Sequence, residues 1–225
     1  TNPLEGQMWY NNTTGTLKVY RNLGGAWAAA PSINVGPATQ REAVSPSIAS
    51  TSAIMCGGTG PGVSPTNAGT QVEDWNGTAW TVGTVMGTGR RAFGASSQTD
   101  TAAVVFGGNP TMATTEEWNG TSWTATGSLA TARQYLAGFG SQTSAVSAGG
   151  YTPAGGAQTL VEEYNGATWT AGTVLPASVY SFTGRGVSET AGFVLYPTPS
   201  PSKQYDGTSW TDAGTLTTAR DGPGL

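Results

Sequence analysis

The sequence predicts an all-β fold of the β-propeller type, built from four-stranded antiparallel blades, and three observations lead to it. One eight-residue stretch recurs four times, at residues 74–81, 117–124, 163–170 and 204–211. Each copy sets Asn-Gly or Asp-Gly between residues that favour extended backbone, which is a β-hairpin signal and typical of a type I′ turn. The last Trp of each copy recurs after 43, 46 and 41 residues, and a period of about 45 residues built from strands is typical of propeller blades.

The length and composition fit a single all-β domain and argue against several classes of partner. Only 10% of the 225 residues are charged, against about a quarter in average soluble domains, while eight Trp, eight Tyr and five Phe supply apolar area for burial. The net charge is −4 and the nine basic residues are scattered, so we expect no nucleic-acid partner. We also expect no membrane partner, because the sequence has no apolar run of membrane-spanning length and no signal peptide.

The first 30 residues predict three short strands. The segments Glu5–Asn11 and Thr16–Asn22 flank a Thr-Gly turn, and the second alternates with a period of two residues. A third segment, Leu23–Trp27, contains Gly-Gly and ends in Trp, and the second and third segments together resemble the later hairpins. A complete unit has four strands, and residues 1–30 supply all of them except the first.

Four complete units follow, and we assign them to residues 38–86, 87–130, 131–176 and 177–217. The first three begin near a Thr-x-Arg sequence and continue with a Gly/Ala-rich strand and an apolar strand ending in Gly-Gly, and all four close with the recurring hairpin. The apolar run from Ala102 to Phe106 predicts a strand buried on both faces. Residues 59–70 and 151–159 change length between units, as surface loops do.

The unit resembles the kelch repeat over roughly residues 38–220. An apolar-Gly-Gly strand, a Glu-x-aromatic strand, a turn, a Trp strand and a segment leading to Arg follow one another in three of the units. The fourth unit departs from this pattern, since Val179 stands in place of Arg and Leu195-Tyr196 in place of Gly-Gly. We therefore expect the fourth blade to be distorted.

The termini together supply the parts of one further blade. Residues 1–30 would give three strands and residues 218–225 the missing first strand, so the closing blade of a five-bladed ring would be shared by the N- and C-termini. Closure protects sheet edges that an open row of blades leaves exposed. The rival interpretation is a fragment of a larger propeller or fibre.

Two sets of residues recur once per blade and are predicted to be structural. They are the hairpin tryptophans Trp80, Trp123, Trp169 and Trp210, and the repeat arginines Arg41, Arg90, Arg133 and Arg220. The tryptophans should dominate blade packing, because each buried ring removes about 150–250 Å² from water. The arginines are expected to bond between strands within each blade; the alternative is a ring of cations that binds an anion.

A third set precedes the turns and has two interpretations, packing between blades or a sugar-stacking surface for ligand binding. Its members are Trp75, Trp118, Tyr164 and Tyr205. Packing is the favoured interpretation, since these aromatic residues recur with the blade.

The sequence indicates a protein that is not an enzyme and that needs no cofactor or metal. It contains no His, which excludes Ser-His-Asp and Cys-His catalysis and His-based metal sites. Acidic pairs recur at 73–74, 116–117 and 162–163 and would suit a glycosidase or a Ca²⁺ site if their carboxylates converged. Neighbouring strand residues point to opposite faces, so we expect instead that the first acid of each pair bridges to a repeat arginine.

A second resemblance suggests where the protein acts. Residues 5–27, with Gly-Gln-Met-Trp-Tyr-Asn, a Thr-Gly turn and Leu-Lys-Val-Tyr, look like a segment of bacteriophage virion proteins such as the tail fibres and appendages of marine tailed phages. The resemblance implies a virion-surface protein that binds other virion proteins or a host surface glycan, within an oligomeric assembly. A bacterial glycan-binding adhesin is the alternative, and a glycan hydrolase or lyase is a third, disfavoured class.

Overall fold

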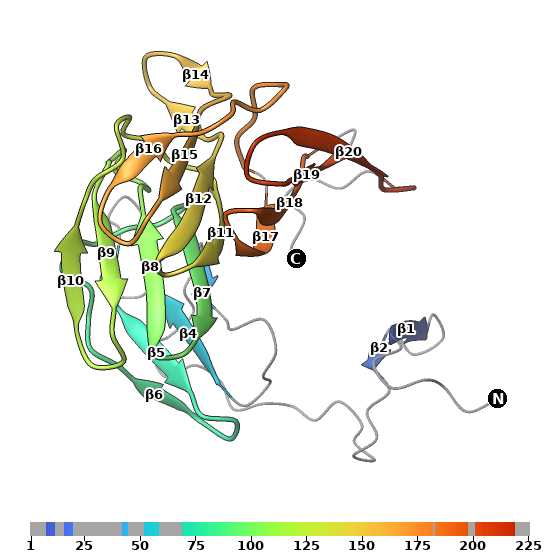
Figure 1. Cartoon of the computed structure of the whole chain (residues 1–225). Helices are drawn as coiled ribbons and strands as arrows, with labels where there is room; N and C mark the ends of the chain where they lie inside the picture. The colour runs from blue at the N-terminus through green and yellow to red at the C-terminus, as the bar shows by residue number, and fades with distance from the viewer. Residues whose placement is uncertain are drawn as a thin grey trace. The chain divides into compact units, whose positions relative to one another are not determined.

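All regular structure in the described part of the chain is β-strand (Figure 1). The computed structural model describes residues 8–11, 16–19 and 42–44 as backbone strands, and residues 52–58, 69–181, 183–197 and 201–218 in full. The chain divides into two compact units, residues 1–32 and residues 33–225. The predicted all-β class is therefore confirmed.

The larger unit contains four four-stranded antiparallel sheets, one for each repeat. The first sheet consists of β3 (Glu42–Val44), β4 (Ala53–Cys56), β5 (Val72–Trp75) and β6 (Trp80–Val82). The second consists of β7 (Gly94–Thr99), β8 (Ala102–Phe106), β9 (Thr115–Trp118) and β10 (Trp123–Thr126). Each strand pairs with its neighbour in the chain, so the order is a simple meander.

The third and fourth sheets repeat the same order. The third consists of β11 (Ala137–Ser141), β12 (Ser144–Ala148), β15 (Val161–Tyr164) and β16 (Trp169–Ala171). The fourth consists of β17 (Thr183–Ser188), β18 (Ala191–Leu195), β19 (Pro201–Tyr205) and β20 (Trp210–Thr215). A short hairpin, β13 (Tyr151–Thr152) with β14 (Gly156–Ala157), lies in the variable loop of the third sheet.

The recurring hairpins form as predicted, but their turn differs from the predicted type. The pre-turn aromatic residue of each copy pairs with the hairpin tryptophan, as Trp118 does with Trp123. Four residues lie between them, and of these only the glycine, such as Gly120, has a positive φ. The Asn119 side chain accepts hydrogen bonds from the backbone N–H groups of Thr121 and Ser122, both at 2.9 Å. The type I′ prediction is therefore wrong, because an Asn-stabilised four-residue loop needs one left-handed residue rather than two.

The cores of the larger unit lie between successive sheets. One buried cluster joins Ile54 and Cys56 of the first sheet to Val105 and Trp118 of the second. A second cluster lies between the second and third sheets, and a third lies between the third and fourth. Strand β8, with its last four residues fully buried, contributes to the first two of these clusters, as predicted for a strand covered on both faces.

The first strands of the last three sheets, β7, β11 and β17, lie next to one another. Their backbones approach closely, because a Cβ atom on Gly138 in β11 would lie 2.5 Å from the Ala95 carbonyl oxygen in β7. Glycine at this position thus permits successive sheets to meet at their first strands. In Figure 1 the fourth strands β6, β10 and β16 lie on the outer side of these sheets.

The fourth sheet carries the distortion that its sequence predicts. The register between β19 and β20 shifts at Ser202 and Lys203, whereas the corresponding strand pairs of the other three sheets are continuous. A second shift, between Gly186 and Ser188 in β17, has an equivalent in the second sheet at Ser97 and Thr99 and so is not special to this sheet.

The smaller unit contains a two-stranded hairpin of β1 (Met8–Asn11) and β2 (Thr16–Val19). Two of the three strands predicted for residues 1–30 are therefore present. The third predicted strand, near Trp27, and the predicted closing strand after Thr218 lie outside the described residues.

Candidate functional site: the repeat residues at the sheet interfaces

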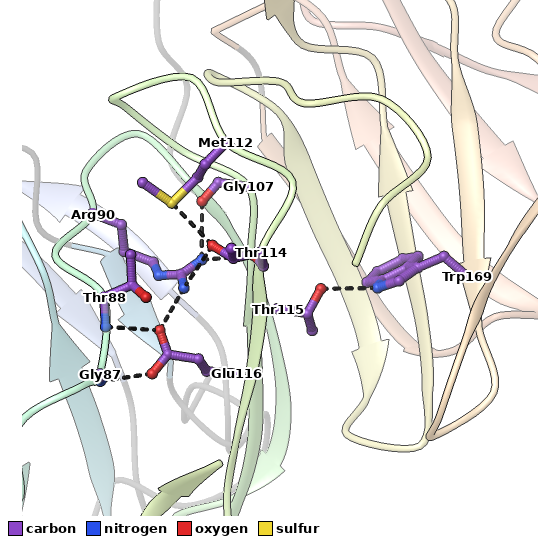
Figure 2. A network of polar contacts seen from close by, with 9 residues as sticks. All are labelled: Gly87, Thr88, Arg90, Gly107, Met112, Thr114, Thr115, Glu116 and Trp169. Atoms are coloured by element: carbon purple, nitrogen blue, oxygen red, sulfur yellow. Dashed lines mark hydrogen bonds and ion pairs between the residues drawn. The ribbon is translucent and has the colours of Figure 1, made fainter. Parts of the chain in front are cut away.

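Arg90 is fully buried and forms an ion pair with Glu116 of its own sheet (Figure 2). The distance between Nη2 of Arg90 and Oε1 of Glu116 is 2.6 Å. The other terminal nitrogen donates to the carbonyl oxygens of Gly107 and Thr114, each at 3.0 Å. Burial lowers the pKa of Arg90, and the charge of Glu116 opposes this effect. The guanidinium group thus joins the ends of β8 and β9.

Glu116 also holds the segment that connects the first sheet to the second. Its carboxylate accepts hydrogen bonds from the backbone N–H groups of Gly87, at 2.7 Å, and Thr88, at 3.1 Å. One buried carboxylate therefore fixes both the arginine and the connection between sheets, as the dashed lines in Figure 2 show.

The third sheet repeats this arrangement with Arg133 and Glu162, whose Nη2 and Oε1 atoms are 2.8 Å apart. Arg133 donates to the carbonyl oxygens of Gly149 and Leu160, at 2.7 and 2.9 Å, and Glu162 accepts from the N–H of Ala130 at 2.7 Å. The prediction that the first acid of a pair bridges to a repeat arginine is confirmed in both sheets.

These contacts decide between the two interpretations of the arginines. Arg90 and Arg133 are 0% exposed, and their terminal nitrogens donate to groups of their own sheets, so they do not offer a cationic surface to an anion. Arg41 and Arg220 lie outside the described residues.

The second acid of each pair acts differently, because it contacts the next sheet. The hydroxyl group of Tyr164 donates to Oε1 of Glu117 at 2.9 Å, and that of Tyr205 donates to Glu163. Burial raises the pKa of Tyr164 to about 12, and the neighbouring carboxylate contributes in the same direction. Each of these glutamates therefore ties its own sheet to the one that follows.

Asp74 is the equivalent residue of the first sheet, and its environment differs. The facing aromatic residue of the second sheet is Trp118, which donates its indole N–H to the carbonyl oxygen of Asp100 at 2.9 Å. Burial raises the pKa of Asp74, and the charge of Asp100 adds to the effect. Where the second acid is Glu, a Tyr of the next sheet donates to it; where it is Asp74, the equivalent aromatic residue is Trp118, whose indole donates to a backbone carbonyl oxygen.

The hairpin tryptophans reach back to the preceding sheet. The indole N–H of Trp123 donates to the carbonyl oxygen of Thr84 at 3.0 Å, and that of Trp210 donates to the carbonyl oxygen of Thr173 at 2.8 Å. The indole of Trp169 donates to the hydroxyl oxygen of Thr115 at 3.0 Å (Figure 2). All three rings, like that of Trp80, are half-buried, so they lie across sheet interfaces with one edge exposed.

Three of the four pre-turn aromatic residues are buried, and the sugar-stacking interpretation of this set is therefore corrected. Trp118, Tyr164 and Tyr205 are 4%, 0% and 1% exposed, so their rings cannot stack on an external sugar. They belong to the clusters between sheets, which is the packing alternative. Trp75 is half-buried, with its ring centroid 5.4 Å from that of Trp80.

Two further kinds of site, a metal-binding cluster and a reactive thiol, can be checked in the described residues. No cluster of three or more potential metal ligands occurs among the described residues, and Cys56 is a buried free thiol. Within the same residues, no helix is long and apolar enough to span a bilayer. The acidic pairs at 116–117 and 162–163 bond within their sheets and to the sheets that follow.

Two comparisons of the sequence with known proteins identified no family and no relative. A scan against protein-family models found no match to this chain, and a search of curated proteins found no similar sequence.

Proposed function

We propose that the chain is a non-enzymatic phage virion protein, a small β-propeller displayed on the particle surface that binds the host surface or a neighbouring virion subunit. One observation carries the non-enzymatic part of this proposal. The buried acids Glu116 and Glu162 are held in ion pairs with arginine, and the acids that follow them accept hydrogen bonds from tyrosines of the next sheet. The recurring carboxylates are thus accounted for by assembly of the sheets.

The position on a virion rests on residues 5–27 and on the low charge of the chain. An antiparallel β fold with few charges and many Thr and Gly suits an assembled extracellular structure. The partners are then other virion proteins or a glycan of the host surface.

We further propose that the four sheets are blades of a five-bladed, kelch-like ring. Support comes from the residue six positions after each hairpin tryptophan. In the first three sheets this residue is Met86, Leu129 or Leu175, which are 2%, 4% and 2% exposed at the interface with the next sheet. In the fourth sheet it is Leu216, which is 40% exposed.

The same contrast appears on the second strand. Val104 in β8 and Val146 in β12 are fully buried, whereas the equivalent Phe193 in β18 is half-buried. The fourth sheet thus has an apolar face of the kind that a following sheet covers elsewhere in the unit. A closing blade from residues 1–30 and 218–225 would supply that cover.

Mass spectrometry of phage particles purified from the source culture tests the virion assignment. We expect this chain to co-purify with capsid or tail proteins through a density gradient, and antibody to it to label intact particles. Recovery with bacterial cell envelopes and absence from particles would contradict the assignment and favour an adhesin. Release of sugar fragments from host polysaccharide would instead favour an enzyme.

A further inference from the structure

We infer that three tyrosines at one end of the sheets, Tyr135, Tyr151 and Tyr180, form a binding site for an uncharged glycan, together with the half-buried amide side chain of Asn109, which the buried Gln134 holds in place. This inference rests on the proposed function as a surface-binding protein and specifies the face and the ligand class. The site lies at the end of the sheets that contains Arg90 and Arg133, which we call the arginine end.

A backbone frame at the arginine end repeats from sheet to sheet. Ala92, Tyr135 and Ser181 occupy equivalent positions and have φ angles of 49°, 54° and 58°, a left-handed conformation that non-glycine residues rarely adopt. The N–H of Tyr135 donates to the carbonyl oxygen of Ala92 at 2.7 Å, and the N–H of Ser181 donates to that of Tyr135 at 3.0 Å. This chain of hydrogen bonds connects three successive sheets.

The side chains on this frame do not repeat. The left-handed position holds Ala92, Tyr135 or Ser181, and the position before it holds Arg91, Gln134 or Tyr180. Ala92 and Ser181 maintain the same backbone as Tyr135, and Arg91 and Gln134 occupy the position of Tyr180 in the other sheets. The fold therefore does not require an aromatic ring at either position. The two tyrosines are therefore not explained by packing of the sheets.

The rings of Tyr135 and Tyr151 both lie beside the ring of Tyr180. Its ring centroid lies 5.6 Å from that of Tyr151 and 6.3 Å from that of Tyr135, both in edge-on geometry. Tyr180 is 47% exposed, and Tyr135 and Tyr151 are half-buried. The cluster thus presents apolar ring surface and phenolic hydroxyl groups together, a combination that suits recognition surfaces.

Polar planar groups adjoin the rings. Gln134 and Tyr151 form a two-way backbone bridge, with hydrogen bonds of 3.1 and 2.7 Å. The Asn109 amide donates to the Gln134 side-chain oxygen, and Nε of Arg91 donates to the Asn109 side-chain oxygen at 3.1 Å. This network orients two amides and one guanidinium group beside the tyrosines.

The chemistry of the cluster fits a sugar better than a charged ligand. Among the described residues its groups are rings, amides and phenols with one formal charge, on Arg91, and Nε of that side chain donates to Asn109. A pyranose presents an apolar face that stacks on an aromatic ring and hydroxyl groups that pair with amides. An uncharged glycan of a bacterial surface satisfies both requirements.

Binding of the full chain to an array of uncharged bacterial glycans, namely neutral O-antigen and neutral capsular polysaccharides, with methyl pyranosides in solution as competitors, tests the inference. We expect Tyr180→Ala to weaken binding by at least about tenfold, because it removes the exposed ring at the centre of the cluster. Tyr180→Phe keeps the ring and should retain most of the affinity.

Val187→Ala is the matched control, because Val187 is 54% exposed at the opposite end of β17, and it should bind as the unmodified chain does. Thermal unfolding of each variant verifies that the fold is intact. Absence of binding to every glycan, or binding that Tyr180→Ala leaves unchanged, would overturn the inference. Detection of the chain on phage particles is an independent measurement. Failure of the glycan site would therefore leave the virion proposal intact, and absence from particles would leave a measured glycan site intact.

Discussion

The third and fourth sheets share one strand order but are stabilised differently at the arginine end. In the third sheet, Arg133 and Glu162 form a buried ion pair, and Arg133 also bonds two carbonyl oxygens at the ends of neighbouring strands. In the fourth, Val179 replaces the arginine and Lys203 replaces the glutamate. A charged network in one sheet thus corresponds to an apolar contact in the other.

In the fourth sheet, several substitutions together replace the charged network with apolar packing. Val179 and Tyr196 are 6% and 7% exposed and belong to the same core cluster as Leu175. The strand register corrects the alignment of Leu195-Tyr196 with Gly-Gly, because Leu195 matches Ala148 and Tyr196 matches the first glycine, Gly149. Gly149 has a φ of 57°, which suits glycine, whereas the φ of Tyr196 is not in the left-handed region. Lys203, whose side chain is 18% exposed, pairs with the exposed Asp212.

The comparison distinguishes the features that form a four-stranded sheet from those that stabilise its arginine end. Hairpins and alternating strands are common to both sheets, so the ion pair is not required for four strands to form. Buried ion pairs often stabilise no better than apolar groups of similar volume, but loss of one partner is costly. We therefore expect the third sheet to be the more sensitive of the two to substitution at this end.

The largest predicted effect is that of Arg133→Ala. It leaves Glu162 charged and buried, and it removes the donors to Gly149 and Leu160, so the free energy of unfolding should fall by about 3–5 kcal/mol. Urea denaturation followed by tryptophan fluorescence measures the change.

Lys203→Ala is the matched control in the fourth sheet. Its partner Asp212 has an 83% exposed side chain, so the cost should be about 0–1 kcal/mol. Equal losses for the two variants would contradict the distinction between the sheets.

The next largest effect concerns a feature that the two sheets share. Trp169 lies 4.7 Å from the ring of Phe106, and Trp210 lies 4.5 Å from the ring of Tyr205; each also bonds the preceding sheet. Substitution of either tryptophan by Ala should cost about 2–4 kcal/mol. Calorimetric unfolding of both variants checks this, and a loss below about 1 kcal/mol for either would place that ring outside the packed interface.

A smaller effect should appear in alkaline solution. The pKa of Tyr164 is raised to about 12 in the folded chain, against about 10 when unfolded, so the folded state keeps a proton that the unfolded state loses. Stability contributed by this group is present below pH 10 and declines as the pH rises toward 12. Tyr164→Phe should flatten this decline in denaturation curves, and an identical slope in both proteins would count against the assignment.

Much of the sheet interior could be predicted from the sequence. Strand β8 and the four hairpins follow from local patterns, and the Arg90–Glu116 pair follows from the alternation of side chains along a strand combined with the repeat. The link from Glu117 to Tyr164 was missed because it joins different sheets. A signal for it exists, since the second acid is Glu where the next pre-turn residue is Tyr, and Asp74 where it is Trp118.

Other features were beyond sequence reasoning for physical reasons. The Asn119 side chain accepts two backbone hydrogen bonds in a four-residue loop, and a sequence of Asn-Gly does not distinguish that loop from a tighter turn. The tyrosines around Tyr180 come from three separate connections, so their proximity depends on how the sheets stack. Burial of Trp118, Tyr164 and Tyr205 likewise depends on the neighbouring sheet.

Amide hydrogen exchange of β1, measured beside that of β15 in the same chain, tests the closed ring most directly. An isolated two-stranded hairpin is marginally stable in water, so protection of Tyr10 requires a further sheet beside it. Our account predicts slow exchange at Tyr10, comparable to that of Glu163 in β15. Exchange at the rate of an unstructured peptide would contradict closure by the termini.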